Sequence, residues 1–428
     1  MAAPPKGHAP NLEKFLKSLK GRPLEASIES LISLLKRRQI TGADKCAIAT
    51  AHILLHVVAK SKWSNVDQLL DRVESVGRKL VLARPQELVI GNVVRRVLGL
   101  IRDEAEEDRG GNGDDSMSDV SALPGDEPHS ISADASPPSR PPPRMGLLTS
   151  TSSFHVPQSM FNLLANSPKL DRSSAGSPFG RGSGSSTPMS HAQVANNSAL
   201  RSEVIDGIEE IKDEISQVDD QIASFAEVQI HPGHHVLVYK PSPTVERFLV
   251  AAAKRRKFTV FIAGAAIAKA SEEPPYAALR KQLSKFGVNT INIAGSGITA
   301  YMARINVVII DAEAVTANGS VIAVGGAAMV ARAAREFSKT VIVLGGVFKL
   351  CPDDEPDLNA LVQVGDPMDL VSYDGHMIDI DVATTSSEYI VPDLVDIYIT
   401  NLGPHSRDHL QGVVADHYKI EDVDFLIQ

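Results

Sequence analysis

The residues best placed to bind a ligand are glycines that follow short apolar runs. Asn318-Gly319 is typical of a tight turn, and Gly325-Gly326 precedes a helical pattern. Glycines let backbone N–H groups approach a ligand, and the first turn of a helix attracts anions. The sequence therefore predicts a phosphate or sugar-phosphate pocket containing Asn318, Gly319 and Gly325. The alternative is a plain turn that leads into a helix.

A second glycine pattern runs from Gly295 to Ala300 and has the form G-x-G-x-x-A, which is typical of dinucleotide-binding folds. The helix between Gly297 and Asn306 has room for only about two turns, whereas a dinucleotide-binding crossover needs a longer one. We therefore interpret this pattern as a tight turn and expect no cofactor. No G-x-x-x-x-G-K-S/T loop occurs, which argues against nucleotide hydrolysis by that route.

Histidines and cysteines give no convincing metal or catalytic arrangement. His231, His234 and His235 lie close together, but no cysteine or carboxylate follows at a known metal-ligand spacing. The two cysteines, Cys46 and Cys351, neighbour no Cys-His or Ser-His-Asp pattern. The sequence therefore predicts no metal site and no catalytic residue.

Two groups of cations could bind a partner. Arg95, Arg96 and Arg102 recur on the side of a helix that we expect to be exposed, where they could meet an acidic partner or be solvated. The basic run at 254–257 ends another predicted helix, where cations complement the helix dipole. A phosphate contact or an import signal is the alternative for that run.

Composition narrows the class of protein. Lys and Arg total 43 against 52 Asp and Glu, so the chain is mildly acidic and bulk binding of nucleic acid is not expected. Only two cysteines occur, which fits a reducing compartment. The first ten residues lack an apolar core, and the longest near-apolar run is too short to cross a bilayer. We expect a cytosolic protein without membrane association.

The sequence divides into four segments. Residues 1–109 show apolar residues at helical spacing and predict a helical domain of about five helices. Ser, Pro and Gly supply 40 of the 91 residues from 110 to 200, so we predict a mostly disordered, low-complexity insertion over 110–199. Residues 200–230 predict one long connecting helix whose apolar seam must lie on a sheet or on a second chain.

The last segment, 231–428, alternates β-branched runs with helical patterns. The predicted strands cover Val236–Tyr239, Phe258–Ala263, Asn289–Ile293, Val307–Asp311, Val341–Leu344 and Ile397–Thr400. The main predicted helices are Thr244–Arg256 and Ala323–Phe337. Apolar strands that alternate with helices are typical of a parallel sheet covered on both faces. The predicted fold class is α/β, a helical bundle followed by a doubly wound, mainly parallel sheet.

The ordered set of short motifs resembles a known family. In the helical segment, these are Trp63-Ser-Asn65, Ala83-Arg-Pro85, Gly91-Asn92-Val-Val-Arg95-Arg96 and Ile101-Arg102. In the last segment they include Met302-x-Arg304-x-Asn306, Ala317-Asn318-Gly319, Phe348-Lys349-Leu350 and Ile399-Thr-Asn401-Leu-Gly403. This order is similar to that of the regulatory subunits of eukaryotic translation initiation factor 2B, and the helical pieces are most similar to the beta subunits.

The resemblance implies a Rossmann-like sheet domain and a non-catalytic regulatory or scaffold role. It implies partners, namely the alpha, gamma, delta and epsilon subunits of the factor, and initiation factor 2, especially its alpha subunit. The factor exchanges guanine nucleotide on initiation factor 2 through its epsilon subunit. Its regulatory subunits sense phosphorylation of the alpha subunit of initiation factor 2. The helical domain, including Arg95 and Arg96, is expected to help bind that subunit.

The same resemblance extends to methylthioribose-phosphate and ribose-bisphosphate isomerases, which gives the alternative function of a sugar-phosphate isomerase or a sugar-phosphate or nucleotide sensor. Those enzymes use a cysteine after the first strand and an aspartate five residues before Asn-Gly. The corresponding positions fall near Lys240 and on Glu313. Because both side chains differ, we expect no isomerase activity. Asn318, Gly319 and Gly325 could remain as a relic phosphate pocket.

Overall fold

The computed structural model describes residues 12–110, 189–264, 275–353, 364–365 and 381–425. Most of the predicted low-complexity insertion lies outside these ranges, as do most of the acidic residues between 353 and 380. No helix in the described ranges is long and apolar enough to cross a membrane. The described helices and strands belong to one compact unit.

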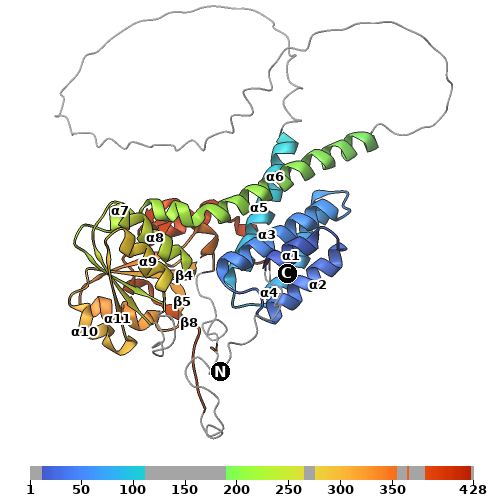
Figure 1. Cartoon of the computed structure of the whole chain (residues 1–428). Helices are drawn as coiled ribbons and strands as arrows, with labels where there is room; N and C mark the ends of the chain where they lie inside the picture. Colours follow the sequence, from blue (N-terminus) through green and yellow to red (C-terminus); the bar gives the residue numbers. More distant parts are fainter. Residues whose placement is uncertain (1–11, 111–188, 265–274, 354–363, 366–380, 426–428) are drawn as a thin grey trace, which may run out of the picture. The chain divides into compact units, whose positions relative to one another are not determined.

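The first part of the chain forms a helical bundle, as predicted. Its helices are α1 (Leu12–Leu19), α2 (Leu24–Lys36), α3 (Ala43–Lys60), α4 (Val66–Ala83) and α5 (Leu88–Gly110). The Asn65 side chain accepts a hydrogen bond from the Gln68 backbone N–H and so caps α4. Figure 1 shows these helices grouped in the blue and cyan part of the ribbon.

A long helix, α6 (Met189–Ser224), follows and leads into the short α7 (Ala226–Gln229). Its predicted seam is buried at Leu200, Val204, Ile208, Ile211, Ile215, Val218 and Ile222. The seam packs on α3 and α5 of the bundle and on α8 beside the sheet, within the same chain. Burying each of these aliphatic side chains stabilises the fold by roughly 1.5–3 kcal/mol. Because the seam contacts both parts, α6 holds the bundle and the sheet together. Figure 1 shows α6 running past both.

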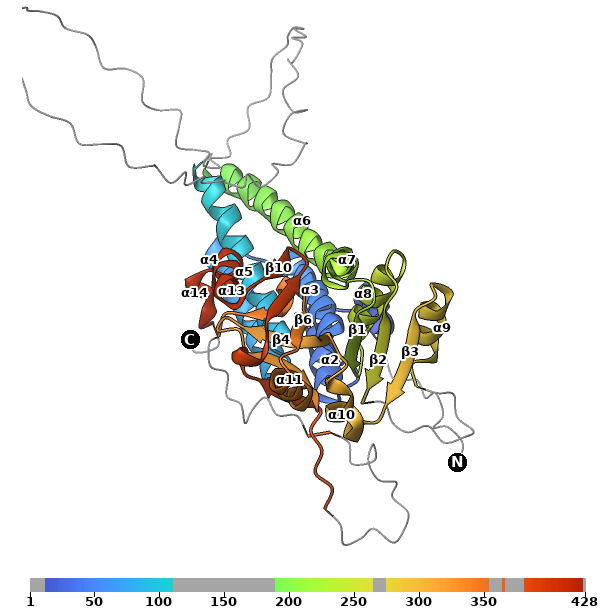
Figure 2. The ribbon, with the colours of Figure 1, turned by 90° about the vertical axis from the view of Figure 1, so that its left-hand side faces the viewer.

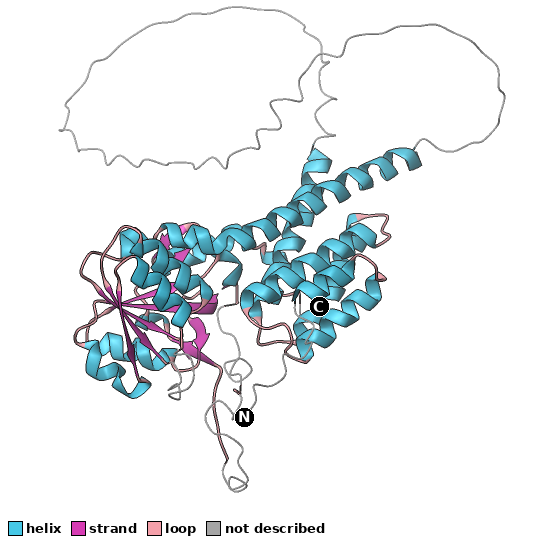
Figure 3. Cartoon of the chain, viewed as in Figure 1, coloured by secondary structure: helices cyan, strands magenta, loops and turns pink. Residues whose placement is uncertain are grey.

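The main sheet is doubly wound. Its parallel strands lie in the order β3 (Asn289–Ile293), β2 (Thr259–Ala263), β1 (His235–Tyr239), β4 (Val307–Thr316), β6 (Thr340–Leu344) and β9 (Ile397–Thr400). The antiparallel β10 (Gly403–His405) pairs with β9. Numbered along the parallel set, this is the 3-2-1-4-5-6 order of Rossmann folds. The predicted fold class is confirmed, and Figure 3 shows the strands gathered in one part.

Helices cover both faces of the sheet. On one face lie α6, α8 (Pro243–Ala253) and α9 (Ala277–Lys285). On the other lie α10 (Ile298–Met302), α11 (Ala327–Glu336) and α13 (Arg407–His417). Alternate residues of β1 enter the two cores, with Val236 and Val238 on the α8 side and Leu237 on the α11 side. Figure 2 shows α8 and α9 beside β1, β2 and β3.

The prediction was wrong at the start of the helix expected over Ala323–Phe337. Residues Val321–Val324 form a strand, β5, and α11 begins only at Ala327. The second half of β4 leaves the main sheet and pairs with β5, with β7 (Leu350–Cys351) and, through β5, with β8 (Ser387–Ile390). Gly326 lies between β5 and α11 and has a φ of 99°. Glycine occupies this position because other residues rarely adopt that conformation.

Candidate functional site

Ligands of doubly wound sheets usually bind where the strand order reverses, which here is the carboxyl end of β1 and β4. Tyr239 ends β1, and Lys240 follows it with a left-handed φ of 42°. The Lys240 Nζ and the Tyr239 hydroxyl both donate to the Gly325 carbonyl oxygen, at 3.1 and 3.2 Å. Lys240 is therefore held against the loop before α11.

A buried lysine joins this edge to the helical bundle. Lys349, in the short 3₁₀ helix η3 (Val347–Lys349), is 3% exposed. Its Nζ lies 3.5 Å from Asp311 of β4 and 3.8 Å from Asp44 of α3. Burial opposes the charged form, but Asp311 and Asp44 together hold the pKa of Lys349 above its ordinary value. Asn92 of α5 donates to the Phe348 carbonyl at 3.1 Å and adds a neutral contact.

The carboxylate at the isomerase aspartate position is also buried. The Ser387 hydroxyl donates to Glu313 at 2.7 Å, and burial raises the pKa of Glu313. Glu313 borders a cavity of about 300 Å³ that also includes Arg38, Arg84 and Glu87. Arg84 and Glu87 form an ion pair at 3.1 Å inside it. This cavity is small, and Arg84 and Glu87 neutralise each other inside it.

The structure does not bring the three predicted phosphate-pocket residues together. Asn318 and Gly319 form the turn before β5, whereas Gly325 follows β5. Four strand residues, at about 3.3 Å each, separate them by roughly 13 Å. The Asn318 Oδ1 accepts bonds from the Thr316 hydroxyl and from both the backbone N–H and the hydroxyl of Ser320. These bonds hold Asn318 and Gly319 in a turn, and ligand binding at that turn stays a prediction.

The start of α11 already holds an anion from the same chain. The Glu388 carboxylate of β8 accepts a hydrogen bond from the Ala328 backbone N–H at 3.1 Å. A carboxylate at a helix N-terminus satisfies the same free N–H groups that would bind phosphate. The Gly325 N–H donates to the Ser386 carbonyl at 2.7 Å, and a Cβ at Gly325 would stand 2.2 Å from the Thr385 oxygen. The glycine therefore permits close strand packing instead of ligand approach.

The expected exposure was wrong for Arg95, and Arg96 and Arg102 are only partly exposed. Arg95 is 3% exposed and forms a bidentate contact with Asp353 at 3.1–3.2 Å. Arg96 pairs with Glu214 of α6 at 2.7 Å, and Arg102 pairs with Asp422 near the carboxyl end of the described chain at 3.0 Å. The helix pattern marked them as polar, but the acidic residues they meet are distant in sequence. These arginines hold α5 to other elements of the same chain.

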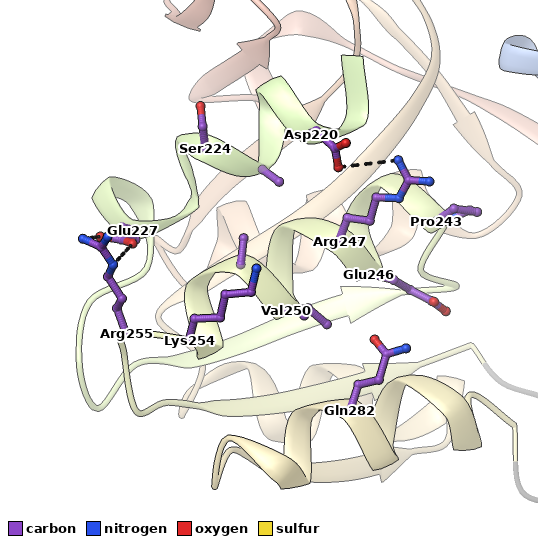
Figure 4. A pocket seen from close by; sticks show the side chains of 12 residues that line it. Asp220, Ser224, Glu227, Pro243, Glu246, Arg247, Val250, Lys254, Arg255 and Gln282 are labelled. Carbon is purple, nitrogen blue, oxygen red and sulfur yellow. Dashed lines mark hydrogen bonds and ion pairs between the residues drawn. The ribbon is translucent and has the colours of Figure 1, made fainter. Parts of the chain in front are cut away.

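The other sequence candidates lie apart from this edge. No group of three or more metal-binding side chains occurs among the described residues. His405 and His409 stack on each other, with ring centroids 5.2 Å apart. The basic run at 254–257 reaches an open groove of about 620 Å³ between α6, α8 and α9, shown in Figure 4. In this groove, Arg247 pairs with Asp220 and Arg255 pairs with Glu227. Most of the charge that lines the groove is therefore neutralised within the chain.

The chain is similar to proteins of known role along nearly its whole length. Residues 39–406 match the initiation factor 2 subunit family. The chain belongs to this family. The translation initiation factor eIF2B subunit beta of Schizosaccharomyces pombe is 32% identical over 406 residues, which cover 92% of this chain and 96% of the relative. The resemblance read from the sequence is confirmed.

Solved structures agree with the family. The crystal structure of eIF2B beta from Chaetomium thermophilum is 45% identical, with a TM-score of 0.69, and the match covers 98% of this chain and 100% of that one. A tetrameric eIF2B-beta2-delta2 complex from the same organism is 45% identical, with a TM-score of 0.66, over 96% of this chain and 100% of that one. The ribose 1,5-bisphosphate isomerase of Pyrococcus furiosus is 26% identical over 126 residues, 29% of this chain and 39% of the enzyme.

Lys349 and its two aspartates were missed as a site from the sequence. The available signal was a lone lysine within an otherwise apolar stretch, residues 341–351. An isolated cation in such a run needs a buried counter-charge. The sequence does not show which carboxylates supply it, because Asp44 lies on a separate helix.

Proposed function

We propose that this chain acts as a beta-type regulatory subunit of the factor that exchanges guanine nucleotide on translation initiation factor 2. The observation that carries the proposal is the 45% identity to an eIF2B beta structure over 98% of the chain. A match of this length includes the bundle, α6 and the sheet. The match to the Pyrococcus furiosus isomerase, by contrast, covers only 29% of this chain.

The role we propose is non-catalytic. At the position near which the isomerases place a cysteine, Lys240 is bonded to the Gly325 carbonyl. At the aspartate position, Glu313 is bonded to Ser387, and Glu388 caps the helix that would receive a phosphate. General acid–base chemistry needs groups that can reach a substrate, and these groups are paired within the chain.

The proposed partners follow from the relatives. One relative forms a beta2-delta2 tetramer, so we propose that this chain pairs with a delta subunit within a larger assembly that also contains alpha, gamma and epsilon subunits. In that assembly it would work in the cytosol and help to sense phosphorylation of the alpha subunit of initiation factor 2. Arg95 and Arg96 already pair with Asp353 and Glu214 of the same chain, which argues against a purely solvent-facing contact surface at these two residues.

Co-expression with the delta subunit of the same organism tests the proposal. We expect a complex with the native mass of two copies of each chain. A chain that remains a homo-oligomer in the presence of delta would contradict it. A thermal-shift measurement with ribose 1,5-bisphosphate tests the alternative, because ligand at about 100 times its Kd stabilises by about 2.7 kcal/mol. We expect no shift, and a clear shift would favour the sensor or isomerase.

A further inference from the structure

A second cleft lies away from the sheet edge, along the side of α5. It has a volume of about 900 Å³ and runs between α5, α6 and the segment from 415 to 421. Its floor is a stripe of α5 that includes Arg96, Gly99 and Asp103. Figure 2 shows α6 crossing near α5, with α13 and α14 (Ile420–Val423) beside it. We name this cleft the α5 groove.

The α5 groove is acidic. Five carboxylates line it, from Asp103, Glu210, Glu214, Asp416 and Glu421, against the cations Arg96 and Lys419. Arg96 is paired with Glu214, and Lys419 is paired with Asp103. Glu210 and Asp416 are exposed and form no ion pair with another described residue. The groove therefore carries negative charge that the described part of the chain does not neutralise.

Two buried atoms beside the groove also have no partner. Asp422 is 1% exposed; its Oδ1 accepts from Arg102, but its Oδ2 bonds to no described residue. The Nη1 of Arg96 is likewise buried without an acceptor in the described chain. Buried polar atoms are nearly always hydrogen-bonded, so the unpaired donor of Arg96, a residue that lines the groove, points to a missing acceptor. Asp422 itself does not line the groove.

The buried Asp422 already has cations beside it. The position that a Cβ of Gly99 would take lies 3.8 Å from the Lys419 Cγ and 4.0 Å from the Asp422 Oδ2, so the Lys419 side chain lies next to that carboxylate. Burial raises the pKa of Asp422 against the opposing effects of Arg102 and Lys419. The charge that an occupant of the groove can meet is therefore that of Glu210 and Asp416, which line the groove and are exposed.

The lining also fits a protein better than a free cation. Leu100 and Ile211 contribute apolar surface, and Ile420 on the rim is 92% exposed. An amphipathic peptide can cover such side chains while its cations meet the carboxylates, whereas a nucleic acid would be repelled.

We propose that the α5 groove is a docking site for a Lys/Arg-rich, partly apolar segment of a partner protein. Cations of that segment pair with Glu210 and Asp416, and a carbonyl group accepts from Arg96. The apolar side chains of the segment cover Ile420. The site is separate from the sheet edge and uses none of the groups that replace the isomerase residues.

The test is fluorescence anisotropy with the full chain alone and a short labelled peptide of alternating arginine and leucine, at physiological salt. The result does not depend on assembly with other subunits. We expect Glu210→Lys with Asp416→Lys to weaken binding about tenfold, because two favourable charges become repulsive.

The matched control is Glu29→Lys with Asp71→Lys, which reverses two exposed carboxylates on α2 and α4. It makes the same change in net charge and should alter the Kd by less than about twofold. An equal loss in the control, or no loss in the groove variant, overturns the proposal. So does equal binding of a peptide with glutamate in place of arginine, or no binding by the unchanged chain.

Discussion

The sheet edge and the α5 groove differ in how their polar groups are used. At the sheet edge, Lys240, Glu313 and Glu388 all bond to atoms of the same chain. In the α5 groove, Glu210 and Asp416 are exposed and form no ion pair with another described residue, and Arg96 keeps a buried donor without an acceptor among the described residues. A polar cluster whose groups are all paired stabilises the fold, whereas exposed unpaired carboxylates are available to a partner. A glycine pattern in the sequence does not by itself distinguish a region whose polar groups are paired from one that is open to a partner.

The largest effect should come from Lys349, which binds the sheet to the bundle. Lys349→Met leaves Asp311 buried without its counter-charge, so we expect the free energy of unfolding to fall by about 3–5 kcal/mol in urea denaturation. Lys419→Met, which removes a half-buried lysine from surface carboxylates, should cost less than about 1 kcal/mol. Combining Lys349→Met with Asp311→Asn should recover part of the loss. Equal effects of the two single variants would contradict a self-satisfied sheet edge.

Gly325→Ala should have the next largest effect. The new Cβ would stand 2.2 Å from the Thr385 carbonyl oxygen, so the segment just before strand β8 must move. We expect a loss of about 1–3 kcal/mol, measured by thermal and urea unfolding. Gly295→Ala is the matched control, because nothing lies within 4 Å of its Cβ position. If both variants were equally stable, Gly325 would not be packed as described.

Glu388→Ala would free the anion position at the start of α11. Removing the carboxylate frees the Ala328 N–H at the start of α11, at a cost of about 1 kcal/mol. Sulfate can then occupy the vacated position, so the Tm of the variant should rise with sulfate more than the Tm of the unchanged chain. Sodium chloride at matched ionic strength is the control. Identical sulfate responses would mean that Glu388 does not occupy an anion position.

The smallest effect concerns Glu313 and pH. Burial raises its pKa above the ordinary 4.5, so the folded chain holds this proton more tightly than the unfolded chain does. Stability from this group is highest below pH 4.5 and falls as the pH rises towards the folded-state pKa. The Glu313→Gln variant lacks this titrating group and should not show the decline. Its free energy of unfolding relative to that of the unchanged chain should therefore increase with pH across this window. A constant difference between the two would contradict a raised pKa.

The sequence predicted the fold well because periodicity reports burial. The strands at 289–293 and 397–400 and the five bundle helices follow from apolar spacing. Strand β5 was missed because Val321–Val324 is apolar on both sides and runs into a true helix, so the local pattern cannot separate the two. The side sheet also depends on β8, which lies more than sixty residues away in the chain.

The site was less predictable, for a related reason. The types of Arg95 and Asp353 were visible, but the pairing between them depends on tertiary contacts. A polar residue on a helix is usually exposed, and only the fold shows that Arg95 faces the loop after β7. The same limit applies to Glu388 and the start of α11, which β5 and β8 bring together.

The most direct test of the account is nucleotide exchange on initiation factor 2 by a reconstituted factor, measured with and without this chain. Phosphorylating the alpha subunit of initiation factor 2 should slow exchange by the complete assembly. Without this chain, the epsilon subunit should retain basal exchange, and the response to phosphorylation should be lost. An unchanged response to phosphorylation in the assembly that lacks the chain would contradict its regulatory role.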